Sequence, residues 1–197
     1  MDKPNAPSCE RNREPILAVL RDRFADRRKV LEIGSGTGQH AVYFAQAMPQ
    51  WFWQCTDRAD NLPGIRQWLD EAALPNTPAP LALDVNDAWP AGDYDAMFSA
   101  NTLHIMGWDE VQSLFLHLPG VTTKDAKLAI YGPFNYGGRY TSESNASFDE
   151  WLQARGEHMR IRDAEAVDAL AEAAGFALID DVAMPANNRL RIWQRTR

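Results

Sequence analysis

Three glycines at alternate positions have the residue type and spacing of a nucleotide-binding turn. They lie in the stretch Val30–His40 (VLEIGSGTGQH), an apolar run that leads into the helical apolar pattern of Ala41, Phe44, Ala45 and Met48. Glycine lets the backbone turn sharply there and lets a ligand approach the main chain closely. The free N–H groups of the following helix would point into the same space. The stretch therefore predicts the first strand–turn–helix of a nucleotide-binding α/β domain.

The glycine spacing and one acid distinguish between two classes of nucleotide. A dinucleotide fingerprint that starts at Gly34 and Gly36 would need a third glycine at position 39, which is Gln39. The pattern is instead E-x-G-x-G-x-G, with Glu32 before the first glycine and Gly38 as the last. A carboxylate at the strand end can receive the ammonium group of S-adenosylmethionine (SAM) but would repel a pyrophosphate. The motif favours SAM over NAD, and a purely structural turn is the alternative.

Polar residues at the ends of the next predicted strands extend this site, because ligands of open α/β sheets lie outside the carboxyl ends of the strands. Asp57 follows the second strand, 19 residues after Gly38, where an acid can accept the ribose hydroxyls. Asp60 is its rival, and a capping acid is the alternative. Asp84 closes the third strand and can accept the adenine amino group. Asn101 follows the fourth strand, where it should lie beside the sulfonium.

His104, one turn beyond Asn101, is the predicted proton acceptor. Histidine titrates near neutrality, so it can take a proton from the methyl acceptor during transfer. Asn101 and His104 are therefore the candidate catalytic residues, with a packing role for His104 as the alternative. The segment lacks Asn-Pro-Pro-Tyr, and the chain has no Pro-Cys nucleophile, the elements of base-methylating enzymes. These absences favour a small-molecule acceptor over a nucleic acid.

Two further segments are candidates for the walls of a substrate site. The first is Cys9–Ile16, which precedes a predicted helix with Pro15 in its first turn. The second is Tyr131–Tyr140, where aromatic residues alternate with glycines in a long loop of the kind that often carries function. A solvated arm is the alternative for the first segment. The candidate substrate-binding residues are Arg11, Asn12, Arg13, Asn135, Tyr136 and Arg139.

Strands and helices alternate along most of the chain, which predicts a single Rossmann-like α/β domain over 1–197. Within it, 1–28 would form an N-terminal lid and helix, and 132–160 an insertion after the fifth strand. The expected sheet has seven mostly parallel strands and a C-terminal antiparallel hairpin, with helices on both faces. The predicted strands are 29–33, 51–56, 80–84, 94–100, 127–131, 177–183 and 189–195. The predicted helices are 13–27, 39–48, 61–73, 108–118, 147–155 and 163–174.

Composition narrows the functional classes. The net charge of −7 argues against a large nucleic-acid interface, which would need a basic face. The basic cluster in 21–29 is better explained as a solvated helix end. No segment approaches the length of a membrane span, and the N-terminus lacks the apolar run of a signal peptide. Cys9 and Cys55 show no metal-ligand spacing. We therefore expect a cytoplasmic protein without a metal. The sequence does not determine its oligomeric state.

Several unusual stretches resemble one family, the domain of unknown function 938 group, which includes the methyltransferase-like 26 proteins. The matching stretches are Cys9–Leu17 (CERNREPIL), Val30–Ala45 (VLEIGSGTGQHAVYFA), Phe98–Trp108 (FSANTLHIMGW), Tyr131–Asp149 (YGPFNYGGRYTSESNASFD) and Met184–Trp193 (MPANNRLRIW). The resemblance implies a class I SAM-binding fold in which Glu32, Gly34, Gly36 and Gly38 occupy the glycine motif. It also strengthens a functional role for Arg11–Arg13. It does not identify the methyl acceptor.

The sequence thus predicts a methyltransferase that uses SAM to methylate a small molecule. A sensor or scaffold that binds SAM without transferring its methyl group is the main alternative, because the cofactor residues are all present while no base is convincing. An NAD-dependent oxidoreductase is a more distant alternative. It would need a glycine at position 39 and a Tyr-x-x-x-Lys pair, and the chain has neither.

Overall fold

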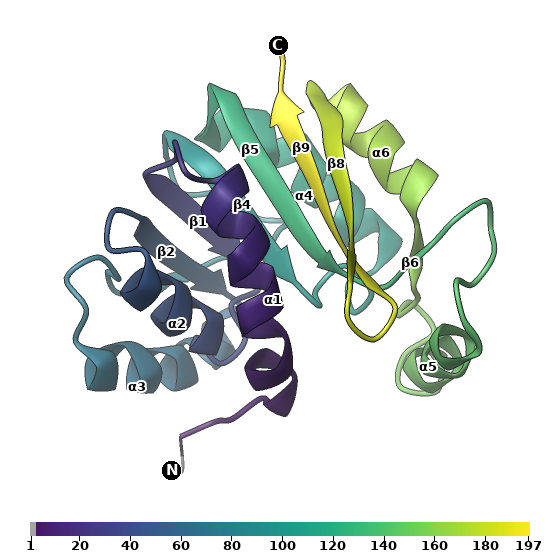
Figure 1. Cartoon of the computed structure of the whole chain (residues 1–197), viewed down its shortest axis with the longest axis horizontal. Coiled ribbons are helices and arrows are strands. Elements are labelled where there is room, and N and C mark those ends of the chain that lie inside the picture. Colours follow the sequence, from purple (N-terminus) through teal and green to yellow (C-terminus); the bar gives the residue numbers. More distant parts are fainter. Residues whose placement is uncertain (1–2) are drawn as a thin grey trace.

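The computed structural model describes residues 3–197 and is built around one seven-stranded sheet (Figure 1). The strand order is β3-β2-β1-β4-β5-β9-β8. Neighbours from β3 to β5 are parallel, whereas β9 runs antiparallel to both β5 and β8. The strands are β1 (Lys29–Ile33), β2 (Phe52–Asp57), β3 (Leu81–Ala82), β4 (Tyr94–Ala100), β5 (Thr122–Gly132), β8 (Phe176–Met184) and β9 (Asn188–Arg195). The predicted seven-stranded sheet with its C-terminal hairpin is confirmed.

Helices cover both faces of this sheet. Figure 1 shows α1 crossing in front of the sheet and α4 behind it. The helices are α1 (Pro7–Arg23), α2 (Gln39–Ala47), α3 (Leu62–Ala72), α4 (Trp108–Val121), α5 (Glu143–Gln153) and α6 (Ala164–Ala173), with a 3₁₀ turn η1 (Ala59–Asn61). A separate two-stranded sheet pairs β6 (Phe134–Asn135) with β7 (Arg162–Asp163). The pattern predicted neither η1 nor these two short strands.

The buried strands supply alternate side chains to two cores, because successive residues of a strand point to opposite faces. Val30 and Phe98 pack with residues of α1, α2 and α3. Leu31 and Met97 pack on the other face with residues of α4 and α6. The two cores hold the central strands between layers of helix, and this fixes where their carboxyl ends emerge.

The strand register brings the predicted site segments to one edge of the sheet. Ile33 at the end of β1 pairs with Thr56 of β2, and Ala100 at the end of β4 pairs with Tyr131 of β5. The chain leaves β1 toward β2 on one side, while β4 lies on its other side. This reversal is the switch point at which open α/β sheets bind ligands. The loops after β1, β2 and β4 therefore meet there.

The first helix differs from its prediction. It begins at Pro7, so residues 9–12, which were expected to precede the helix, are helical. Pro15 lies in the helix interior and not in its first turn. A proline there removes one backbone hydrogen bond, but burial of Ile16, Leu17 and Leu20 against the sheet keeps the helix intact. Residues 1 and 2 of the predicted N-terminal lid lie outside the described part of the chain.

Candidate functional site

The turn between β1 and α2 carries the three glycines in left-handed backbone conformations. Their φ angles are +70° at Gly34, +59° at Gly36 and +87° at Gly38. A Cβ added to Gly34 would lie 2.7 Å from the Thr102 side chain, so the turn packs closely on the segment after β4. A Cβ added to Gly36 would meet nothing within 4 Å. The backbone at Gly36 therefore faces open space, as the close approach of a ligand requires.

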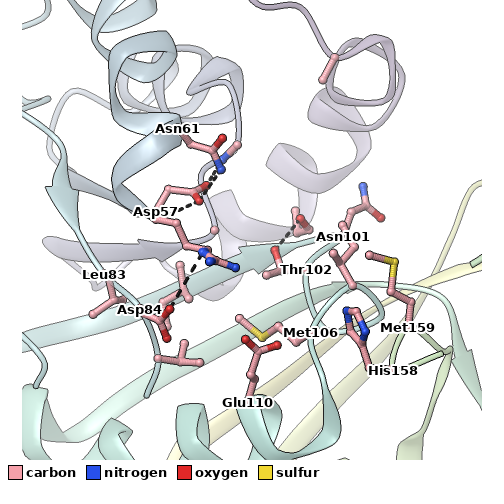
Figure 2. Close-up of a pocket in the computed structure, with 18 residues that line it drawn as sticks. Asp57, Asn61, Leu83, Asp84, Asn101, Thr102, Met106, Glu110, His158 and Met159 are labelled. Atoms are coloured by element: carbon pink, nitrogen blue, oxygen red, sulfur yellow. Dashed lines mark hydrogen bonds and ion pairs between the residues drawn. The ribbon is translucent and has the colours of Figure 1, made fainter. Parts of the chain in front are cut away.

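This open space is a cavity of about 500 Å³, here called the glycine-loop cavity. Figure 2 shows Asp57 and Asp84 on one side of it and Asn101 and Met159 on the other. Its walls come from the segments that follow β1, β2, β3 and β4, together with Ala6 and residues after α5. The lining residues are Ala6, Ile33, Gly34, Gly36, Asp57, Arg58, Asn61, Leu83, Asp84, Val85, Ala100, Asn101, Thr102, Ile105, Met106, Glu110, His158 and Met159.

Asp57 is held firmly at the end of β2. Its Oδ2 accepts the backbone N–H of Gly36 at 2.7 Å. Its Oδ1 accepts the backbone N–H of Arg58 at 2.7 Å and the side-chain amide of Asn61 at 2.8 Å (Figure 2). The carboxylate thus links the glycine turn to η1. Asp60, the rival acid, is exposed in η1 and lines neither this cavity nor the one described below.

Asp84 lies after β3 between two apolar lining residues, Leu83 and Val85. Its Oδ1 accepts the backbone N–H of Asn86 at 3.0 Å, and its Oδ2 lies 4.0 Å from Nε of Arg58. An apolar slot with a carboxylate at its edge has the chemistry to hold a flat ring that carries an amino group. The segment that the sequence predicted to contact adenine therefore does line the glycine-loop cavity.

Glu32 has a different setting from the one predicted. Its side chain is 1% exposed and lines neither cavity. The carboxylate accepts hydrogen bonds from Nε1 of Trp53 at 3.0 Å and from Sγ of Cys55 at 3.7 Å. Burial raises the pKa of this carboxyl group to about 7. The alternation of β1 turns Glu32 toward the core with Val30, where its hydrogen-bond partners belong to β2.

A second cavity of about 770 Å³, here called the α5 cavity, adjoins the first. The two share Asn101, Ile105 and Met159, so they meet at the segment after β4. Helix α5 closes one side beside the β8–β9 hairpin, where the Asn145 amide donates to the Asn187 carbonyl at 3.2 Å. The lining residues are Ser8, Arg11, Asn12, Asn101, His104, Ile105, Tyr131, Pro133, Ser144, Asn145, Phe148, Trp151, Leu152, Arg155, Met159, Pro185, Ala186 and Asn188.

Asn101 and His104 lie at this junction. Asn101 adopts a left-handed φ of +56°, and its backbone N–H donates to the Tyr131 carbonyl at 2.9 Å. His104 is 6% exposed and packs edge-on against Phe148, with ring centroids 5.3 Å apart. Burial lowers the pKa of His104 to about 4, so the ring is neutral at pH 7. Within residues 3–197 neither of its ring nitrogens has a hydrogen-bond partner, which leaves them available to a ligand.

The predicted residues of the N-terminal segment divide between two settings. Arg11 and Asn12 line the α5 cavity. The Asn12 Oδ1 lies 2.7 Å from Nε2 of His40, which holds the amide in place. Arg13 instead stacks its guanidinium over the Tyr43 ring at 4.5 Å and lines neither cavity. The helical conformation of this segment explains the split, because consecutive helical residues point in different directions.

Asn135, Tyr136 and Arg139 line neither the glycine-loop cavity nor the α5 cavity. Asn135 belongs to β6, which pairs with β7. The Tyr136 hydroxyl donates to Asp181 at 2.7 Å, so this ring is tied to β8. Arg139 is exposed, and its backbone pairs with Tyr136 in a tight turn. The loop therefore folds away from the cavities, and the structure does not bring these three residues to the predicted substrate site.

Helix α5 supplies wall residues that the sequence analysis missed. Phe148 and Trp151 lie on one side of the helix with ring centroids 5.6 Å apart, and Arg155 stacks on Trp151 at 3.3 Å. Positions 148 and 151 are three residues apart on one face of α5, and Arg155 follows just after the end of the helix. This signal was present in the sequence, but periodicity alone does not tell which cavity such a face covers.

Residues 3–197 contain neither a metal-binding cluster nor a membrane-spanning helix. No group of three or more His, Cys, Asp or Glu side chains is placed to hold a metal ion in this part of the chain. None of its helices has both the length and the apolar character to cross a membrane.

Several solved structures with a similar fold are methyltransferases. An O-methyltransferase family protein from Burkholderia thailandensis has a TM-score of 0.82 and 20% identity, over 93% of this chain and 56% of that one. The N,N-8-amino-8-demethyl-D-riboflavin dimethyltransferase from Streptomyces davawensis has a TM-score of 0.79 and 18% identity, over 96% and 55%. An O-methyltransferase family 2 protein from Planctomyces limnophilus, in complex with apigenin, has a TM-score of 0.74 and 16% identity, over 93% and 61%.

The chain spans less than two thirds of the length of each of these structures. At such identities the likeness shows the class I methyltransferase fold and leaves the reaction open. The model of the family described as protein of unknown function (DUF938) matches residues 3–195. The chain therefore belongs to the DUF938 family, and it has the class I methyltransferase fold.

Proposed function

We propose that this protein is a SAM-dependent methyltransferase that acts on a small-molecule acceptor. The observation that carries the proposal is the junction of two cavities at Asn101 and Ile105. One cavity is built on the glycine turn at the switch point of the sheet, and the other is walled by aromatic side chains with a neutral histidine. Two binding spaces that meet at one point are what transfer of a group between two molecules requires.

The chemistry of the lining of the glycine-loop cavity supports SAM as its ligand. Gly36 offers backbone with open space in front of it. The fixed carboxylate of Asp57 would accept the ribose hydroxyls, and Asp84 between Leu83 and Val85 would accept the adenine amino group. Asn101 would lie beside the sulfur. When bound, SAM supplies an electrophilic methyl group on a positively charged sulfur.

The residues of the α5 cavity would position and activate the acceptor. A ring nitrogen of His104 would take the proton from the attacking hydroxyl or amine, because the ring is neutral and its nitrogens have no partner within residues 3–197. Phe148 and Leu152 would exclude water from the reacting atoms. Arg11 and Asn12 would contact the part of the acceptor that does not react.

Calorimetry with SAM and with S-adenosylhomocysteine tests the cofactor half of the proposal. We expect saturable binding of both, and the absence of binding by either at about 1 mM would overturn it. Transfer of a labelled methyl group from SAM to the small molecules of a cell extract tests the reaction. Tight binding of SAM without labelled product in such extracts would instead support a sensor that does not transfer.

Replacing Asp57 with alanine should weaken the affinity for S-adenosylhomocysteine about 10- to 100-fold. The change removes the ribose partner and leaves the N–H of Gly36 without its acceptor. Calorimetry measures the affinity, and thermal unfolding verifies that the variant is folded. Asp60→Ala is the matched control, because Asp60 is exposed and lines neither cavity. Equal affinities for the Asp57→Ala variant and the wild type would contradict the assignment.

A further inference from the structure

The lining of the α5 cavity has a charge opposite to that of the whole chain. The protein carries a net charge of −7. Among the described residues that line this cavity, however, there are two arginines, Arg11 and Arg155, and no Asp or Glu. The adjoining glycine-loop cavity does have acidic lining residues, namely Asp57, Asp84 and Glu110. The acceptor side of the junction is therefore the positive one.

Neither arginine forms an ion pair with a carboxylate of residues 3–197. Arg11 makes no ion pair and no side-chain hydrogen bond there. Arg155 stacks on Trp151, and its guanidinium donates to the Trp151 carbonyl at 3.5 Å. Arg23 and Arg191, by contrast, are each paired with aspartates. A planar guanidinium left free beside a cavity is suited to bind a carboxylate through two parallel hydrogen bonds.

The aromatic side chains of the α5 cavity form a row that leads from a buried ring to an exposed one. The buried His104 ring packs on Phe148, Phe148 stacks on Trp151 with an interplanar angle of 23°, and Trp151 carries the guanidinium of Arg155. Trp151 is 48% exposed, whereas His104 is 6% exposed, so the row runs from the cavity junction to the surface. A flat apolar molecule would lie along it, since aromatic rings favour stacked and edge-on contacts. Its reacting end would be near His104 and its other end near a cation.

On the basis of the function proposed above, we infer that the methyl acceptor is a flat aromatic molecule with a carboxylate group. The hydroxyl or amine that receives the methyl group lies at the His104 end, and the carboxylate lies at the opposite end beside Arg155, with Arg11 as the second cation of the cavity lining. The absence of an acid from the described lining disfavours a cationic acceptor, which would leave its charge without a partner.

Calorimetry with three matched probes tests this acceptor class. The probes are 6-hydroxy-2-naphthoate, its neutral analogue 6-hydroxy-2-naphthamide, and the cationic 6-(aminomethyl)naphthalen-2-ol, each titrated into protein saturated with S-adenosylhomocysteine. The naphthoate should bind about tenfold more tightly than the naphthamide, and the cation most weakly. Arg11→Gln and Arg155→Gln should each reduce the preference for naphthoate over naphthamide. Arg21→Gln, an exposed position on the same helix as Arg11, should not change it.

Three results would overturn the inference. These are a naphthamide that binds as tightly as the naphthoate, a preference that survives both arginine substitutions, and no naphthoate binding at about 1 mM. A prior titration with S-adenosylhomocysteine distinguishes the two proposals. If S-adenosylhomocysteine binds but the naphthoate does not bind more tightly than the naphthamide, the inferred acceptor class is wrong while the proposed function stands. If S-adenosylhomocysteine does not bind, the proposed function fails, and the probes titrated into protein alone still measure the preference of the α5 cavity.

Discussion

Replacing His104 with glutamine should lower kcat for methyl transfer by about 10²- to 10⁴-fold, the range that general-base catalysis contributes. Glutamine is close to histidine in size, so it preserves much of the packing on Phe148, but its amide cannot take a proton. The affinity for S-adenosylhomocysteine should stay unchanged, because His104 lines the α5 cavity and not the glycine-loop cavity. Single-turnover transfer of a labelled methyl group and calorimetry provide the two measurements.

The pH profile separates a proton acceptor from a packing residue at position 104. Because burial lowers the pKa of His104 to about 4, the neutral ring predominates from about pH 5 upward. We expect kcat/KM to fall as the pH drops through about 4 and to stay level above it. The control is His117→Gln, since the His117 ring stacks on Trp89 and lines neither cavity. Equal losses in the two variants, or a midpoint near the ordinary value for histidine, would contradict the role of His104.

The architecture could be predicted because each strand and helix is marked by residues within its own stretch of sequence. Strands and helices alternate with clear breaks, and the β4 prediction of 94–100 matches the observed Tyr94–Ala100. The glycines, Asp57 and Asp84 were found because they follow strands, and parallel strands deliver such residues to one edge. The start of α1 was predicted wrongly for a local reason as well. Pro7 and Pro15 both suit a first helical turn, and the pattern does not choose between them.

The wall of the α5 cavity could not be predicted because it depends on contacts between distant segments. The loop after β5 contains Asn135 and Tyr136, which look like substrate contacts in the sequence. In the structure Asn135 pairs with Asp163 through β6 and β7, and Tyr136 bonds to Asp181. These partners are 28 and 45 residues away. The loop is thereby directed away from the cavities, and Phe148 on α5 takes its place.

The direction in which the Glu32 side chain points could not be predicted from the sequence, for a different reason. A strand buried on both faces shows no alternation of polar and apolar residues, so the pattern does not reveal which side each residue faces. In β1 the residues Val30, Leu31, Glu32 and Ile33 are all buried. Glu32 faces the core with Val30, where Trp53 and Cys55 donate hydrogen bonds to it. In this setting the acid of the glycine motif supports the turn from within the core, and its contact with the cofactor stays a prediction.

This setting predicts how the stability of the protein depends on pH. Burial raises the pKa of Glu32 from an ordinary 4.5 to about 7, so between these values the folded chain retains a proton that the unfolded chain has released. This retained proton stabilises the folded state. The stabilisation is fully present below pH 4.5 and is lost as the pH rises through about 7. A shift of this size corresponds to about 3 kcal/mol. The wild type should therefore be less stable at pH 8 than at pH 4.5 on account of this group.

Glu32→Gln should remove this dependence, because the amide oxygen still accepts the Trp53 hydrogen bond and carries no charge. Urea unfolding should show the variant more stable than the wild type by about 3 kcal/mol at pH 8 and nearly equal to it at pH 4.5. Glu14→Gln, an exposed position on α1, is the control that should change neither value. The same variant decides between the two roles of Glu32. A carboxylate that received the ammonium of SAM would lose affinity on this change, whereas one turned into the core would leave it intact.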